Sequence, residues 1–564
     1  MQNTQDGGEA ILEALRNLDV DYIMSSPGSE WGPLWEALAR QQVGNAPGPT
    51  YLSCWHETLA VNLAWGYTAI TGRLQAVVLH AGAGLLQGSM GIHAANVTGT
   101  PMVIMSGESL TYGEQAGFDP GRQWHGSLSI VGGPHRLMEP IVKWANQASS
   151  PATLYEQVVR AGEMAQRTPA GPVYLNVPIE NMLHEWARPD RLRKAPPAPK
   201  PEASDADVEA VAKLLAQAKN PAIITEGAGR SAEGFEALVA LAEALAVPVF
   251  ENPSAKCANF PKSHPLYQGA AFRPVKDEFD LVLLARSKAP WYPPSDGPKN
   301  ATVVAIDENP LDERMVYQSL LANVYLEGDM PSSLRRLAEA AAPDADAALI
   351  GERRARWRAA HERATEAHGK AEAEARSKSP IDPAWLCARL SAVMPSDAIY
   401  VDETTTHRGA VQNHLMWNAP HDYIKVPTGL GQGLGAALGV KLACPDRPVV
   451  SIIGDGGFLY NPVTQCLGLS MEANLPILIV VFNNVGYNAM RANHLSYYPD
   501  GTAKQNGLYL GHTIKGPDYA ELIRPFGGYG RKVEDPAELD DALREGLAAV
   551  REGKTAILNV VLCQ

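Results

Sequence analysis

The chain has 564 residues, of which 45% are hydrophobic and 20% are charged, a composition typical of a globular protein with several domains. Its formal net charge of −14 at pH 7 is unfavourable for a surface that binds nucleic acid, and no apolar run approaches the ~18 residues of a membrane helix. The N-terminal segment lacks the basic and apolar regions of a signal peptide, and the six cysteines form no CxxC pair, so we expect a cytoplasmic protein with reduced thiols.

The first part of the chain, residues 1–185, alternates between strand and helix patterns. Helices are expected at residues 8–18, 31–39 and 59–71, and strands at residues 22–24, 50–53, 76–79, 101–105 and 173–177. Such alternation predicts a parallel sheet with helices on both faces. Loops that follow the first three expected strands carry Ser29, Glu57 and His80.

A linker and a middle domain come next. Residues 186–204 are rich in proline and charge, which is typical of a linker. The middle domain spans residues 205–345, with helices expected at 206–218 and 232–246 and strands at 222–225, 247–250, 281–285 and 302–306. Its Gly227 and Gly229 are followed by Gly234, a longer spacing than the GxGxxG of a dinucleotide loop. A bound dinucleotide and a glycine turn at a strand–helix junction both fit this pattern, and we favour the turn.

The last domain spans residues 381–564. Residues 351–378, before it, are rich in alanine, arginine and glutamate with few apolar positions, which predicts a solvated surface helix between domains. Within the domain, the glycine-rich segment 428–435 leads into a helix of small residues. Small residues of this kind indicate a backbone pressed closely against a cofactor.

Two buried strands in this domain are followed by oxygen-bearing residues. Residues 449–453 form an apolar, β-branched run that is broken by the glycine-rich loop Gly454-Asp455-Gly456-Gly457, and residues 477–482 form a second run. Because parallel strands end on one edge of a sheet, we expect the Asp455 carboxylate, the Asn484 amide oxygen and the Gly486 carbonyl to converge. Three such oxygens predict a Mg²⁺ site that holds a diphosphate.

These motifs resemble a known family. GDGG after one strand and Asn-Asn at the end of the next resemble the signature of thiamine diphosphate (ThDP) enzymes, and the motif order along the chain resembles the acetolactate synthase and benzoylformate decarboxylase branch. The resemblance implies an α/β fold of three doubly wound parallel-sheet domains: pyrimidine-binding (1–185), middle (205–345) and diphosphate-binding (381–564). It also implies ThDP and Mg²⁺ as cofactors, with Asp455, Asn484 and Gly486 as the metal ligands. The implied cofactor-binding residues are Glu57, Gly429, Leu430, Gly454, Asp455, Gly456, Gly457, Asn484, Gly486 and Tyr487.

Glu57 has a specific role in this resemblance. The cofactor's aminopyrimidine acts as a base only when a carboxyl group hydrogen-bonds its N1′ nitrogen, and Glu57 stands before a helix of small residues, where that carboxyl group is expected. The alternative is a helix N-terminal glutamate that only complements the helix dipole. Leu430 is expected to wedge beneath the cofactor.

Further catalytic residues follow from the resemblance to benzoylformate decarboxylase. His80 and Ser29 match its active-site histidine and its Pro-Gly-Ser serine, and Gln123 and His125 lie where relatives place residues that face substrate. An imidazole suits proton transfer, and a serine hydroxyl can hold a substrate carboxylate. The alternatives are a structural imidazole and a plain turn serine. The loop at 286–294 lacks the family's second histidine and also the arginine–aspartate pattern of FAD-binding relatives, so we do not expect FAD.

The sequence thus predicts a ThDP-dependent 2-oxo acid decarboxylase or carboligase that acts through an enamine (Breslow) intermediate. Substrates would be a small 2-oxo acid and, for ligation, an aldehyde acceptor, with no nucleic acid or membrane partner. The resemblance further implies a homodimer or homotetramer whose sites are shared between chains. Two alternatives are a flavin or nicotinamide oxidoreductase that uses the middle domain, and a non-catalytic protein with the ThDP-enzyme fold.

Overall fold

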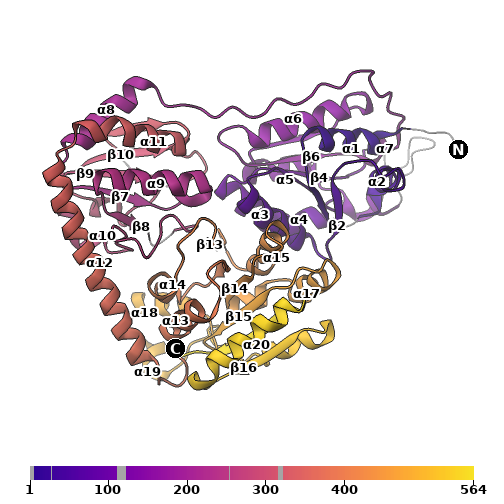
Figure 1. The fold of residues 1–564 in the computed structure, drawn as a ribbon. Helices are drawn as coiled ribbons and strands as arrows, with labels where there is room; N and C mark the ends of the chain where they lie inside the picture. Colours follow the sequence, from indigo (N-terminus) through magenta and orange to yellow (C-terminus); the bar gives the residue numbers. More distant parts are fainter. Residues whose placement is uncertain are drawn as a thin grey trace. The chain divides into compact units, whose positions relative to one another are not determined.

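The computed structural model describes residues 5–26, 28–110, 122–252, 255–315, 322–427 and 429–563 (Figure 1). The described strands form three sheets, in the orders β2-β1-β3-β4-β6-β5, β11-β10-β9-β7-β8 and β13-β12-β14-β15-β17-β16. Every pairing within them is parallel. The predicted fold class, three doubly wound parallel sheets, is confirmed. The strands are β1 (Tyr22–Ser25), β2 (Thr50–Ser53), β3 (Gln75–Val78), β4 (Met102–Ser106), β5 (Trp144–Gln147), β6 (Pro172–Asn176), β7 (Pro221–Thr225), β8 (Val249–Glu251), β9 (Leu281–Ala285), β10 (Thr302–Asp307), β11 (Val324–Glu327), β12 (Ile399–Glu403), β13 (Tyr423–Lys425), β14 (Val449–Gly454), β15 (Leu478–Asn483), β16 (Tyr529–Val533) and β17 (Ala556–Val561).

Helices connect these strands and cover the sheets. None of the helices in the described ranges has the length and apolarity that a membrane span requires. The α-helices are α1 (Gly7–Asn17), α2 (Gly32–Val43), α3 (Glu57–Thr71), α4 (Ala83–Thr98), α5 (Pro134–Met138), α6 (Leu154–Gln166), α7 (Ile179–Leu183), α8 (Asp205–Gln217), α9 (Ala232–Leu245), α10 (Phe272–Val275), α11 (Met330–Ala341), α12 (Ala347–Ala375), α13 (Pro383–Val393), α14 (Arg408–His414), α15 (Gly433–Ala443), α16 (Asp455–Tyr460), α17 (Val463–Glu472), α18 (Asn488–Tyr497), α19 (Thr502–Asn506) and α20 (Leu539–Arg551).

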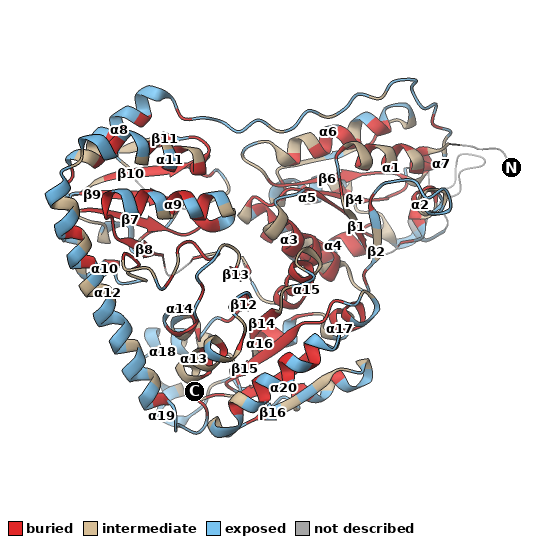
Figure 2. Cartoon of the chain, viewed as in Figure 1, coloured by how far each residue is buried: buried red, intermediate tan, exposed pale blue. Residues whose placement is uncertain are grey.

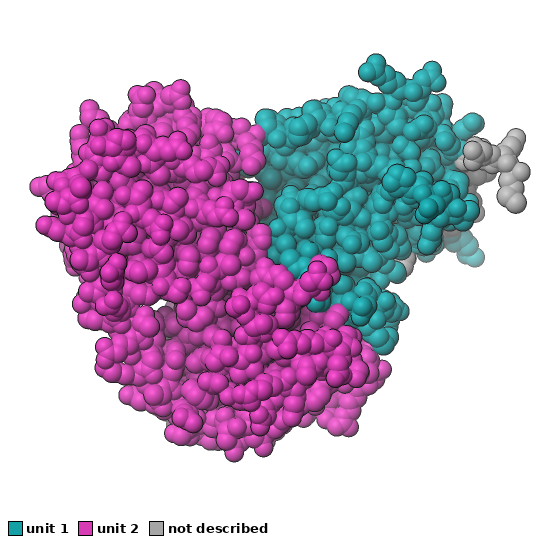
Figure 3. Space-filling view, viewed as in Figure 1, with its two compact units in different colours: residues 1–199, 427–444, 461–475 teal, residues 200–426, 445–460, 476–564 magenta. Residues whose placement is uncertain are grey.

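The chain forms two compact units, coloured separately in Figure 3. The first unit contains residues 1–199, 427–444 and 461–475, and the second contains residues 200–426, 445–460 and 476–564. The sheet β1–β6 therefore belongs to the first unit, together with α15 and α17, whereas the sheets β7–β11 and β12–β17 belong to the second.

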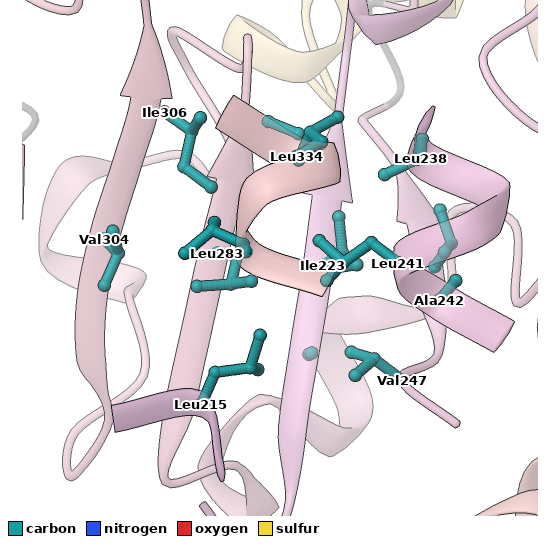
Figure 4. Packing of buried hydrophobic residues seen from close by; sticks show 14 of the residues in the cluster. Leu215, Ile223, Leu238, Leu241, Ala242, Val247, Leu283, Val304, Ile306 and Leu334 are labelled. Atoms are coloured by element: carbon teal, nitrogen blue, oxygen red, sulfur yellow. The ribbon is translucent and has the colours of Figure 1, made fainter. Parts of the chain in front are cut away.

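Burial explains why the strands form where they do. Strands at the centre of each sheet are continuous apolar runs and are buried on both faces, as expected for parallel sheets (Figure 2). In the middle sheet, Ile223 of β7 and Leu283 of β9 lie in one apolar cluster with residues of α9 and α11, among them Leu334 (Figure 4). By contrast, α12 is exposed along most of its length, which confirms the predicted surface helix (Figure 2).

The glycines of the middle domain are explained by packing within that domain. A Cβ atom at Gly229 would collide with the carbonyl of Ala258, and one at Gly234 would collide with the carbonyl of Ala228. The Gly234 N–H also bonds the Oγ of Ser231, which caps α9, at 3.2 Å. These contacts support the turn at a strand–helix junction.

Helix α15 packs closely against α3. Its small residues pack along α3 within the first unit: a Cβ atom at Gly439 would collide with the carbonyl of Leu63, and one at Gly66 of α3 would collide with the carbonyl of Ala436. The small residues of α15 therefore allow two helix backbones to approach closely. This helix packing accounts for Gly435 and Gly439, and the predicted cofactor contact of segment 428–435 stays a prediction.

Candidate active site

The predicted metal-binding residues lie at one edge of the third sheet. Strands β14 and β15 pair in parallel, with Gly454 opposite Phe482, so both strands end at the same edge. Asp455 follows β14 directly and Gly486 lies in the loop after β15. The Asp455 carboxylate accepts a hydrogen bond from the Gly486 N–H at 2.9 Å and another from the Gly456 N–H at 3.0 Å. The structure therefore brings the Gly486 N–H to the Asp455 carboxylate, and the predicted role of the Gly486 carbonyl as a metal ligand stays a prediction.

Asp455 is a buried carboxylate that accepts hydrogen bonds from backbone N–H groups. Only 2% of the residue is exposed, and burial raises the pKa of Asp455 to about 6 although these N–H groups lower it. Within the described ranges, no ion pair joins Asp455 to a basic side chain. A divalent cation would supply the opposite charge that this carboxylate needs, so the site fits the Mg²⁺ of the predicted cofactor.

Asn484 is oriented by a histidine that the sequence did not single out. The Nδ2 atom of Asn484 lies 3.0 Å from Nε2 of His407. An amide nitrogen only donates hydrogen bonds, so His407 Nε2 accepts and the imidazole is neutral. Burial lowers the pKa of His407 to about 4, which agrees with that state. With its nitrogen bound to His407, the amide presents Oδ1 as the atom that a cation would bind.

The loop predicted at 454–457 is replaced by a helix. Helix α16 begins at Asp455, immediately after β14, and Gly454, Gly456 and Gly457 all have negative φ. Two of these glycines differ in the space beside their backbone. A Cβ atom at Gly456 would lie 2.6 Å from the ring of Tyr487, and no described atom lies within 4 Å of the Cβ position at Gly454. The end of β14 therefore has room beside its backbone, as a bound diphosphate requires.

A strained residue shapes the loop after β15. Val485 has φ of 58°, a left-handed conformation that costs a β-branched residue on the order of 1–3 kcal/mol. Its N–H bonds the Oδ1 atom of Asn483 at 3.1 Å, and the Tyr487 N–H bonds the carbonyl of His512 at 2.7 Å. These bonds hold the strained loop, and the Gly486 N–H within it is directed at Asp455.

Glu57 and His80 converge in the first unit. Glu57 is the first residue of α3, which is capped by His56, whose Nδ1 accepts from the Thr58 N–H at 3.1 Å. Gly84, near the start of α4, lies between the two predicted catalytic residues. A Cβ atom at Gly84 would lie 2.8 Å from Oε1 of Glu57 and 2.8 Å from Cβ of His80. The Glu57 carboxyl group and the Cβ atom of His80 thus lie on either side of one glycine.

His80 has a buried partner that the sequence did not identify. Its Nδ1 lies 2.9 Å and 3.1 Å from the two carboxylate oxygens of Glu30, a residue that is 1% exposed. This hydrogen bond raises the pKa of His80, although burial opposes the shift. The sequence offered one clue to this pair, the position of each residue after a strand. Glu30 follows β1 and His80 follows β3, and these strands pair in parallel.

The remaining predicted residues of the first unit lie in short helical turns and beside α15. The Nε2 atom of Gln123 donates to the Oγ of Ser29 at 3.3 Å, so these two predicted substrate-facing residues are neighbours. The side chain of His125 lies outside the described part of the structure. Gly429 is exposed with φ of 66°, and Leu430 beside it is half-buried. Its predicted position beneath a cofactor stays a prediction.

Family models match the chain in three consecutive segments. The N-terminal TPP binding domain of thiamine pyrophosphate enzymes matches residues 5–128, the central domain matches residues 208–337, and the C-terminal TPP binding domain matches residues 403–560. Together they cover more than half of the chain. The chain belongs to the thiamine pyrophosphate enzyme family. Thiamine pyrophosphate is ThDP, so the predicted family is confirmed, and the chain is a ThDP-dependent lyase or transferase.

Several relatives of this thiamine pyrophosphate enzyme span nearly its whole length. It is 28% identical to a probable 2-ketoarginine decarboxylase of Pseudomonas aeruginosa, over 97% of this chain and 92% of that protein. It is 27% identical to a benzoylformate decarboxylase of Pseudomonas aeruginosa, over 96% of both, and 26% identical to a sulfoacetaldehyde acetyltransferase of Rhodobacter capsulatus, over 99% and 94%. The structure of a ThDP-dependent 4-hydroxybenzoylformate decarboxylase from Rhodococcus jostii RHA1 has the same fold, with a TM-score of 0.78 and 22% identity over 99% of each chain.

Proposed function

We propose that this enzyme is a Mg²⁺- and ThDP-dependent decarboxylase or carboligase of 2-oxo acids. The observation that carries the proposal is the convergence of Glu57 and His80 around Gly84 in a chain of this family. Catalysis by a ThDP enzyme needs a carboxyl group and a group that moves protons, and these two residues are of the required types. Relatives named as decarboxylases of 2-oxo acids support the same substrate class.

Each half of the proposed site has a separate task. Asp455, Asn484 and the Gly486 carbonyl would hold Mg²⁺ and, through it, the diphosphate. Glu57 would share a proton with the aminopyrimidine ring. When bound, ThDP supplies a nucleophilic carbon that adds to the 2-oxo group and accepts the electron pair left by departing CO₂.

Three residues of the first unit would act on the substrate. His80 would deliver and remove protons during turnover, because an imidazole can gain and lose a proton and the hydrogen bond to Glu30 raises its pKa. Ser29 and Gln123, which are hydrogen-bonded to each other, would hold the substrate carboxylate through their polar atoms. His125 lies two residues after Gln123 and would belong to the same group.

We also propose that each site is built from two chains. Glu57 and Asp455 belong to different compact units of one chain. In the family that the sequence resembles, the first domain of one subunit and the last domain of another share a site. A two-fold symmetric dimer then contains two equivalent sites, and a tetramer contains two such dimers.

A substrate panel tests this proposal. The purified protein is incubated with ThDP and Mg²⁺ and with pyruvate, branched, aryl and guanidino 2-oxo acids, and CO₂ and organic products are quantified. We expect CO₂ release from at least one acid, dependent on both cofactors and absent from Glu57→Gln. Aldehyde products identify a decarboxylase, and acyloin products identify a carboligase. Absence of CO₂ release from every acid, in a protein shown to bind ThDP, overturns the proposed substrate class.

A further inference from the structure

The feature that goes beyond the proposed function is the buried carboxylate of Glu30. Glu30 lies in the 3₁₀ turn Ser29–Trp31 that follows β1. One of its oxygens accepts the Ala81 N–H at 2.8 Å, and both lie within 3.1 Å of Nδ1 of His80. Its charge is therefore directed at the imidazole and at the backbone that carries it.

The surroundings of Glu30 are fitted to this contact. A Cβ atom at Gly28 would collide with both the Glu30 carboxylate and the His80 ring, so only glycine leaves the contact intact. Trp31, the next residue, donates its indole N–H to the carbonyl of Leu79 at 2.9 Å. This bond ties the turn to the residue that precedes His80. Gly28 thus leaves space for the contact, and the Trp31 bond holds the segment of Glu30 against the segment of His80.

A neutral residue would fill this space at lower cost. Burying a carboxylate is expensive unless a charged or strongly donating partner compensates it. His80 is the titratable partner that the structure provides within hydrogen-bond distance of Glu30. A buried charge at this contact would influence the tautomer and the charge of the His80 imidazole.

We propose that Glu30 is a positioning residue that fixes the tautomer of His80. The neutral ring then carries its proton on Nδ1, directed at Glu30, and the proton exchanged with substrate binds and leaves Nε2. No bond other than Nε2–H forms or breaks on the histidine in this step. The inference rests on the proposed function only in giving His80 a substrate to act on. Glu30 itself touches no substrate.

The same contact sets the pH range over which His80 changes charge. The hydrogen bond to Glu30 is the largest influence on the pKa of His80 and raises it, burial lowers it, and the charges of Glu30 and Glu57 raise it further. Glu30 reaches the ring from the turn after β1, and Glu57 reaches it from α3. Loss of the Glu30 charge should therefore lower the pKa of His80.

The free energy of unfolding should also depend on pH through His80. Because the folded pKa of His80 is raised above its ordinary value of about 6.5, the pair stabilises the fold fully below that value. The contribution is then lost as the pH rises through the folded pKa. Glu30→Gln should remove this pH-dependent part of the free energy of unfolding.

The test is an NMR titration of His80 in protein labelled with ¹³C and ¹⁵N in histidine rings, without cofactor. The His80 signal is assigned from the spectrum of His80→Asn. In the parent protein we expect ¹⁵N shifts of a proton on Nδ1 and a pKa above about 6.5. Glu30→Gln should lower that pKa. The matched control is Glu180→Gln, which neutralises another buried glutamate of the same unit whose hydrogen bonds come from Ser109 and Leu110.

Turnover gives a second readout. We expect Glu30→Gln to reduce kcat by about 10–100-fold, as for other residues that act through a functional side chain, and to shift the acid limb of the kcat/KM profile to lower pH. Glu30→Asp should restore part of both. A parent ring with its proton on Nε2, or an unchanged His80 pKa in folded Glu30→Gln, overturns the proposal. If Glu30→Gln does not fold, the proposal is tested by the tautomer of His80 in the parent protein, read from its ¹⁵N shifts. Because the titration needs no turnover, it gives an answer even if the proposed substrate class is wrong.

Discussion

At the residue scale, two buried carboxylates lie just after parallel strands, and we propose a separate role for each. Asp455 and Glu30 are both almost fully buried, but their partners differ. Glu30 contacts an imidazole, whereas the Asp455 carboxylate accepts hydrogen bonds from the N–H groups of Gly456 and Gly486. We therefore propose that Asp455 binds a cation and that Glu30 controls the state of a histidine.

Glu57→Gln should separate catalysis from helix stability. An amide of the same size cannot share a proton with the aminopyrimidine, so turnover should fall by about 10²–10⁴-fold or more. ThDP affinity, by calorimetry, should change little. The matched control is Glu156→Gln, which also removes an acidic residue from the first turn of a helix, here α6. If Glu57→Gln turns over at the parent rate, Glu57 serves only the helix dipole.

His407→Ala should weaken Mg²⁺ binding without touching a metal ligand. The Asn484 amide would lose the acceptor that holds its nitrogen, and its oxygen would no longer be held in position. We expect the Mg²⁺ concentration needed for half-maximal ThDP binding to rise about 10–100-fold. His407→Gln, whose side-chain oxygen can accept the same bond, should recover part of the affinity. Equal Mg²⁺ dependence in all three proteins would contradict this role.

Residue contacts were predictable from the sequence where strand order alone produces them. Asp455 and Gly486 follow adjacent strands, so a parallel sheet is enough to bring them together. Glu30 with His80, and His407 with Asn484, also follow strand ends, but their pairing depends on side-chain direction and on packing between segments far apart in the chain. The distance between two such residues along a single sequence does not indicate that they pair, and neither of these two pairs was predicted.

At the scale of elements, the close packing of α3 and α15 organises the first unit. Glycines on both helices face the partner backbone, and the Asn62 side chain of α3 donates to the Gly431 carbonyl before α15 at 3.2 Å. Because α3 begins at Glu57, this packing fixes the helix that presents the proposed catalytic carboxyl group. The small residues were visible in the sequence, but the partner that they face was not.

Gly439→Ala should therefore destabilise the protein. The added methyl group would collide with the Leu63 carbonyl, and overpacking of this kind costs about 1–3 kcal/mol. The matched control is Gly369→Ala in the exposed helix α12, where the new methyl group meets no described atom within 4 Å. That change should stabilise α12 by up to about 1 kcal/mol through helix propensity. The check is urea unfolding of both variants, and equal shifts in the same direction would contradict the packing account.

Some elements with strong apolar patterns were predicted, whereas others, among them the buried strands β12 and β17, were not singled out. The expected strand at residues 281–285 coincides with β9, which is buried throughout. The edge strands β5 and β11 were not predicted, because most of their residues are only partly buried and their sequences lack a continuous apolar run. Helix α16 was read as a loop because glycines suggest a turn, although the helix follows β14 directly.

At the scale of the whole molecule, the chain carries two sets of functional residues in separate units. Glu57, His80 and Glu30 belong to the first unit, whereas Asp455 and Asn484 belong to the second. ThDP needs both a carboxyl group for its ring and a metal site for its diphosphate. The proposed dimer supplies both sets to each of two equivalent sites.

Mixing two inactive variants should restore activity if the sites are shared between chains. Glu57→Gln and Asp455→Ala are co-expressed with different affinity tags, and mixed dimers are isolated. A mixed dimer would contain one site with both changes and one site with neither, so it should have about half the parental activity per dimer. Each variant alone should be inactive. Mixed dimers without activity would mean that each site is built within one chain.

The central claim is that the edge formed by β14 and β15 holds the diphosphate of ThDP through a divalent cation. Calorimetric titration of ThDP into the protein, with Mg²⁺ and then with the metal chelated, tests it most directly. We predict saturable binding that requires Mg²⁺ in the parent protein and is lost in Asp455→Ala, because the site would have one fewer anionic oxygen. ThDP binding that survives both chelation and Asp455→Ala would contradict this account.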